Sequence, residues 1–167
     1  DLILKNKEEN IASFVLAPDK YDLSRFKLYL YTNEVGKEII NFKTDIFQYG
    51  QIHYTNNSYR EALEMLFGTF QFDILHVHHF LFQTFDAIEI AKKRNIKSII
   101  TLHDLYMSCP SINMVYQDKF CEKDPNKDCA KCLKIRYGVN SDILQNWRKT
   151  CENILGKFDK IIVPSEN

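Results

Sequence analysis

The sequence predicts an α/β fold, in which an open parallel sheet carries helices on both faces. From residue 58 onward, helical and strand-like patterns alternate along the chain. The strand-like runs are nearly continuously apolar, which is typical of strands that are buried on both faces of a parallel sheet. Such strands, joined by helices, form β-α-β units.

The first third of the chain reads as short strands. β-Branched and aromatic runs at 11–17, 25–32 and 38–42 are separated by turn-forming residues, and 49–54 is a weaker candidate. No functional motif stands out in this part of the sequence.

Helices are predicted at 58–70 and 84–95. In the first, Ser58 and Glu61 have the spacing of a capping box. In the second, Thr84 is the expected N-cap, followed by an acidic first turn and a basic last turn.

Buried strands are predicted at 73–77, 98–102 and 159–165. A helix at 141–158 lies between the last two. Its apolar stripe comprises Ile143, Leu144, Trp147, Cys151, Ile154, Leu155 and Phe158. A cysteine-bearing insertion of irregular structure is expected at about 103–140.

Composition excludes several classes of function. The chain has 167 residues, 45% of them hydrophobic, which is enough for one globular domain. Lysine plus arginine equals aspartate plus glutamate at 22 each, so no basic surface for nucleic acid is indicated. No apolar run is long enough to cross a membrane, and no leader opens the chain. We therefore expect a cytoplasmic protein.

Titratable side chains follow two successive predicted strands. His76, His78 and His79 lie at the end of 73–77, and His103 and Asp104 follow 98–102. Ligands of open α/β sheets bind at the carboxyl ends of the strands, so this cluster is the predicted site. The alternative is that each histidine merely caps a strand or fills a polar gap.

Three stretches, "FDILHVHHFL", "IITLHDLYMSCP" and "FDKIIVPSEN", resemble the N-terminal half of retaining glycosyltransferases of the GT-B architecture, in family 4. The resemblance covers roughly residues 70 to 167. It implies a hexosyltransferase-type enzyme of polysaccharide biosynthesis that moves sugar from a nucleotide-sugar donor to a glycan or glycolipid acceptor. It also implies that transfer needs no cofactor or metal, and that any membrane contact is peripheral, at the inner face.

The same resemblance implies roles for individual residues. His103 is expected to touch the donor sugar near the reacting carbon, and Asp104 to orient His103 or bind an acceptor hydroxyl. The expected substrate-binding residues are His76, His78, His79, Tyr106 and Ser165.

The chain also departs from the family pattern. Its glycines, at 36, 50, 68, 138 and 156, form no glycine-rich loop for donor phosphates. We therefore expect one Rossmann-like domain over 1–167 that lacks the first β-α unit and the C-terminal donor-binding domain. Such a domain is expected to be inactive alone.

Four cysteines, Cys109, Cys121, Cys129 and Cys132, fall in the irregular segment with the spacing C-x11-C-x7-C-x2-C. The terminal C-x2-C is suited to a tetrahedral ion, so one hypothesis is a structural zinc. The alternatives are thiols without metal, or a disulfide pair. Cys151 is predicted to be a core residue.

Two other functions fit parts of the sequence. A metal-dependent hydrolase could use the histidine cluster as ligands. A zinc-stabilised, non-enzymatic interaction module could use aromatic side chains to bind a macromolecule. Metal bound at the histidines rather than at the cysteines would favour the hydrolase.

Overall fold

The computed structural model describes residues 5, 6, 8, 9, 11–31, 35–45, 54–121, 129, 131–134 and 142–163, with side chains of the last range described from 146 onward. The chain divides into two compact units, Asp1–Phe47 and Gln48–Asn167, which are treated separately below. The expectation of a single domain over 1–167 stays a prediction.

The first unit contains an antiparallel sheet of three strands. Its strands, in the order in which they pair, are β1 (Ser13–Pro18), β2 (Arg25–Tyr31) and β3 (Gly36–Lys43). Phe26 and Leu28 of β2 are buried, and the ring of Phe26 stacks on Phe42 with 5.6 Å between centroids. These strands confirm the predictions for 11–17, 25–32 and 38–42. Residues 49–53 of the weaker candidate lie outside the described part.

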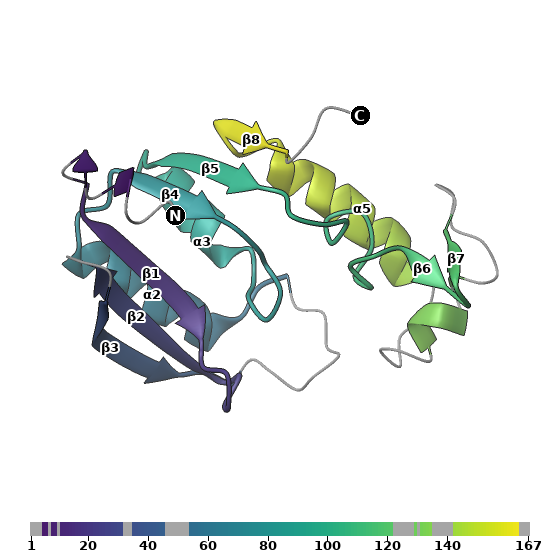
Figure 1. The fold of residues 1–167 in the computed structure, drawn as a ribbon, viewed down its shortest axis with the longest axis horizontal. Coiled ribbons are helices and arrows are strands. Elements are labelled where there is room, and N and C mark those ends of the chain that lie inside the picture. The colour runs from purple at the N-terminus through teal and green to yellow at the C-terminus, as the bar shows by residue number, and fades with distance from the viewer. Residues whose placement is uncertain are drawn as a thin grey trace. The chain divides into compact units, whose positions relative to one another are not determined.

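The second unit contains a parallel sheet in the order β4-β5-β8 (Figure 1). The strands are β4 (Ile74–Val77), β5 (Lys97–Thr101) and β8 (Lys160–Ile162). The helices are α2 (Asn57–Thr69) before β4, α3 (Asp86–Lys93) between β4 and β5, and α5 (Asp142–Leu155) before β8. The predicted α/β fold, with a parallel sheet flanked by helices, is confirmed.

The core of this unit joins the sheet to α3 and α5. Val77 of β4 and Ile100 of β5 belong to the same buried cluster as Ile88 of α3. The residues that α5 and its C-terminal end add to the cluster are Trp147, Cys151, Ile154 and Phe158. Cys151 is 1% exposed, in agreement with its predicted place in the core.

Both predicted helix starts are wrong by one or two residues. The N-cap of α2 is Asn56, whose side chain accepts a hydrogen bond from the Tyr59 N–H, so Ser58 lies inside the helix and is not its N-cap. The N-cap of α3 is Phe85 rather than Thr84. Thr84 instead donates its hydroxyl to Asp86 at 2.6 Å.

The reason for both shifts is a buried carboxylate. Asp86 is fully buried and also accepts hydrogen bonds from the Asn56 N–H at 2.9 Å and from Nε of Arg60 at 2.8 Å. A buried charge must be compensated by partners, so the starts of α2 and α3 are set by this contact between helices. The acidic first turn and basic last turn of α3 are as predicted.

The segment between β5 and α5 contains regular structure that the sequence did not reveal. β6 (Val115–Tyr116) and β7 (Lys119–Phe120) form an antiparallel hairpin. Its two turn residues, Gln117 and Asp118, have φ of 50° and 60°, as type I′ turns require. Neither is a glycine, so the turn has no strong signal in the sequence. Among the described residues, no helix combines the length and apolar character needed to cross a membrane.

Candidate functional site

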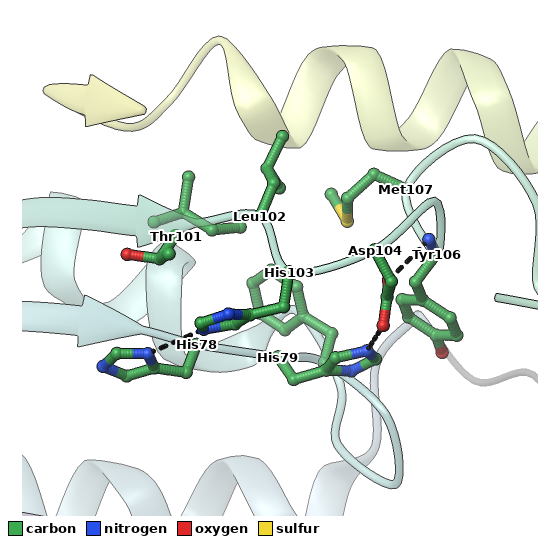
Figure 2. A pocket seen from close by; sticks show the side chains of 10 residues that line it. His78, His79, Thr101, Leu102, His103, Asp104, Tyr106 and Met107 are labelled. Atoms are coloured by element: carbon green, nitrogen blue, oxygen red, sulfur yellow. Dashed lines mark hydrogen bonds and ion pairs between the residues drawn. The ribbon is translucent and has the colours of Figure 1, made fainter. Parts of the chain in front are cut away.

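The predicted histidines and aspartate meet at the carboxyl edge of β4 and β5. β4 ends at Val77 and is followed by His78 and His79, while His103 and Asp104 lie just beyond the end of β5. Val77 pairs with Ile100 in the parallel register, which brings the two strand ends side by side. We call His76, His78, His79, His103 and Asp104 the histidine edge; all but His76 are labelled in Figure 2.

Two histidines from different strand ends contact each other directly. Nδ1 of His78 lies 3.1 Å from Nε2 of His103, at hydrogen-bonding distance, and the rings stack with 5.4 Å between centroids. His76 stacks on His78 at 4.2 Å and bonds the hydroxyl of Thr101 through Nε2 at 2.8 Å. Residues of β4 and β5 thus form one continuous contact across the strand ends.

The remaining histidine holds the aspartate. Nδ1 of His79 accepts the N–H of Leu81 at 2.7 Å, so the ring proton must be on Nε2. Nε2 therefore donates to Oδ2 of Asp104, also at 2.7 Å. The N–H of Tyr106 donates to Oδ1 of Asp104 at 2.8 Å. Among the described residues, the side chain of Asp104 is thus hydrogen-bonded to His79 and Tyr106, and no hydrogen bond joins it to His103, one of the two roles expected for it from the sequence.

The family model for Glycosyltransferase Family 4 matches residues 10–167, which is nearly the whole chain. This chain belongs to glycosyltransferase family 4. No curated protein matched the chain, and no solved structure matched it.

Two imidazoles of the histidine edge have a lowered pKa. Burial lowers the pKa of His76, and the neighbouring His78 and His103 lower it further. Burial, followed by the charge of His103, lowers the pKa of His78. His76 and His78 are therefore uncharged near neutral pH and act in the site as hydrogen-bonding groups rather than as cations.

The histidine edge borders an open hollow of about 230 Å³ (Figure 2). Its lining residues are His78, His79, Phe80, Ile100, Thr101, Leu102, His103, Asp104, Tyr106 and Met107. Tyr106 is fixed from outside the hollow, because its ring packs edge-on against Trp147 and its carbonyl accepts the indole N–H at 2.9 Å. The turn that carries Asp104 is therefore anchored to α5.

All but one of the residues predicted to form the glycosyltransferase site gather at this edge. Ser165 is the exception, since it lies outside the described residues. Thr101, the partner of His76, was not among the predicted site residues. Its position offered a signal, because Thr101 lies two residues before His103 and so on the same side of an extended chain. Trp147 was predicted only as a core residue of its helix, and its bond to the Tyr106 carbonyl joins segments that are distant in the sequence.

The cysteines gather elsewhere. Cys109, Cys121, Cys129 and Cys132 line a second hollow of about 360 Å³, together with Ser111, Met114, Tyr116, Leu133 and Arg148. We call it the cysteine hollow. In the part of the chain that the structure describes, no three side chains of histidine, cysteine, aspartate or glutamate are arranged to hold a metal ion. At the histidine edge, Nε2 of His76 bonds Thr101, and Nδ1 of His78 and Nε2 of His103 bond each other. Both nitrogens of His79 are engaged, with Leu81 and Asp104.

Proposed function

We propose that this domain serves the transfer of a sugar from a nucleotide-activated donor to a glycan or glycolipid acceptor, with His103 and Asp104 at the reacting centre. The observation that supports this best is the meeting of His78 with His103, beside the pair of His79 and Asp104, at the edge where α/β sheets bind ligands. Membership of glycosyltransferase family 4 supplies the class of reaction.

His103 is positioned to contact the donor sugar. Its Nε2 faces His78, whereas its Nδ1 has no partner among the described residues, and the side chain is exposed at the hollow. The contact with His78 fixes the plane of the ring. A fixed imidazole can hold a sugar hydroxyl while positive charge develops at the anomeric carbon and the diphosphate leaves, which lowers the barrier by positioning.

Asp104 is the proposed contact for an acceptor hydroxyl. A carboxylate has about four acceptor sites, and the hydrogen bonds from His79 and Tyr106 use two of them. The carboxylate is 28% exposed, so the remaining sites are accessible from the hollow. His79 acts as a positioning residue, because it orients Asp104 and has both ring nitrogens engaged.

The donor nucleotide is proposed to bind a second Rossmann domain, as the family resemblance implies. Transfer, with retention at the anomeric carbon and no metal at the reacting atoms, would then take place in a protein that contains both domains. The domain described by this chain would supply the acceptor side and His103.

The test is the rate of transfer by the full-length protein with His103→Ala. We expect kcat/KM to fall by at least roughly two orders of magnitude, as it does when a positioned transition-state contact is lost. Release of nucleoside diphosphate from a panel of nucleotide-sugars, with lipid-linked and free glycans as acceptors, would first identify a working substrate pair.

Lys97→Ala is the matched control. Lys97 is exposed at the opposite end of β5 from His103, so its loss should leave the rate unchanged. Undiminished transfer by the His103→Ala protein would show that the reacting centre has been placed wrongly.

A further inference from the structure

We propose that the cysteine hollow binds one structural zinc ion through Cys109, Cys121, Cys129 and Cys132. The four thiols come from three separate places in the chain. Cys109 lies on the turns after Asp104, Cys121 directly follows β7, and Cys129 and Cys132 come from one short helical stretch. Their convergence on one hollow is the first observation, since four thiolates form a closed tetrahedral zinc site.

The backbone between Cys109 and Cys121 is folded to bring these two residues together. Cys109 receives the N–H of Ile112 on its carbonyl, at 2.9 Å, and the N–H of Cys121 donates to the carbonyl of Met114, at 2.7 Å. Ile112 and Met114 have φ of 71° and 51°. A left-handed conformation is costly for a β-branched residue and persists only where the surroundings impose it. The strained backbone of Ile112 and Met114 thus places Cys109 and Cys121 at the same hollow.

The surroundings of the thiols suit a metal–thiolate centre. The hydroxyl of Ser111, a buried residue, lies 3.1 Å from Sγ of Cys109. If Cys109 binds metal as a thiolate, its sulfur can only accept a hydrogen bond, so the Ser111 hydroxyl is the donor. Hydrogen bonds to the atoms that bind a metal are common in metal sites. A zinc ion with four thiolates has a net charge of −2. Arg148, which lines the hollow and donates to the Ser108 carbonyl at 3.2 Å, supplies opposite charge.

Binding requires the thiols to move inward, because no three described ligands are arranged around a common point. Zinc–sulfur bonds of about 2.3 Å would draw them towards the centre of the hollow. The energy of such binding stabilises the fold, since the unfolded chain has no preformed site. A metal would therefore fasten the turns that follow Asp104 to the C-x2-C turn, independently of the sugar-transfer chemistry.

The test is to titrate the reduced full chain with Co²⁺ and then with Zn²⁺. We expect one Co²⁺ per chain, with the sulfur-to-cobalt charge-transfer band and the strong visible bands of a tetrahedral thiolate site, all displaced by Zn²⁺. Absence of the charge-transfer band in the wild-type chain would overturn the proposal. So would isolation of the chain with disulfides among these four cysteines and no bound metal.

Variants distinguish the proposed ligands from other cysteines. Cys132→Ser should abolish stoichiometric binding, whereas Cys151→Ala, a change in the core and away from the hollow, should retain it. Ser111→Ala should weaken Zn²⁺ binding by roughly tenfold. Equal metal content in the wild-type and Cys132→Ser chains would show that the ion binds elsewhere, and would also overturn the proposal.

Discussion

The histidine edge and the cysteine hollow both include residues that follow β5, yet they are held in different ways. At the histidine edge, two parallel strand ends place the residues, and the imidazoles and carboxylate bond one another at 2.7 to 3.1 Å. At the cysteine hollow, strained turns and a hairpin bring the thiols around one space, and no three of the described side chains are arranged there to hold a metal ion. The register of two parallel strands is enough to place side chains next to one another at the strand ends. Side chains on irregular turns need a further interaction, such as a metal–thiolate bond, to hold them together.

α5 connects the two regions through consecutive residues. The indole N–H of Trp147 donates to the carbonyl of Tyr106, beside Asp104, and Nε of Arg148 donates to the carbonyl of Ser108, beside Cys109. We therefore expect substitution of Trp147 to disturb both regions and to lower the stability of the fold. Substitution of His79 should lower only the rate of transfer. A fall in pH should destabilise the histidine edge before it affects the cysteine hollow.

The largest effect is expected from Trp147→Ala. Trp147 is 1% exposed and packs against Tyr54, Phe85 and Tyr106, so its removal should lower the free energy of unfolding by about 3–5 kcal/mol. Trp147→Phe keeps an aromatic ring but leaves the Tyr106 carbonyl without its donor, and should cost less. Urea unfolding followed by circular dichroism measures both, since Trp147 is the only tryptophan. Equal costs for the two variants would show that packing of the aromatic ring adds nothing beyond the hydrogen bond to Tyr106.

A smaller effect, confined to catalysis, is expected from His79→Ala. Without its imidazole donor Asp104 should lose its orientation, and kcat of the full-length protein should fall on the order of tenfold to a hundredfold while KM for the donor stays the same. His79→Gln should recover part of the rate, because its amide can donate to Asp104. Failure of glutamine to improve on alanine, with melting temperatures unchanged, would contradict the positioning role.

The smallest effect concerns acid stability. Because burial and neighbouring histidines lower the pKa of His76 and His78, the unfolded chain takes up protons first as the pH falls through about 6.5. The stability associated with these residues is therefore complete above that pH and is lost below it. Urea unfolding between about pH 7.5 and pH 5.5 should show the decline.

Two comparisons isolate the contribution of the histidines to acid stability. A chelator present at every pH keeps the cysteine hollow free of metal, so loss of metal in acid cannot contribute to the decline in stability. His78→Asn, which keeps a polar group near the position of Nδ1 but does not titrate, should decline less steeply than the wild type. An identical slope in both proteins would assign the acid sensitivity to other groups.

Much of the second unit could be predicted from the sequence. Apolar runs identified β4, β5 and β8, the helical stripe identified α5, and the positions of His78 and His103 after two strands predicted a shared edge. These features are local, or follow from the single rule that parallel strands end at the same side of a sheet. The family assignment rested on the same short stretches and was confirmed.

Only the tertiary structure decided the pairing of side chains. Asp104 accepts a hydrogen bond from His79, because the N–H of Leu81 occupies Nδ1 of His79 and leaves Nε2 protonated to donate to the carboxylate. The starts of α2 and α3 differ from the predicted ones because buried Asp86 accepts hydrogen bonds from Arg60, Asn56 and Thr84. Spacing along the chain sets which strand end a residue occupies. The bond of His79 to Asp104 and most of the compensation of Asp86 depend on groups 25 to 30 residues away, which no local pattern encodes.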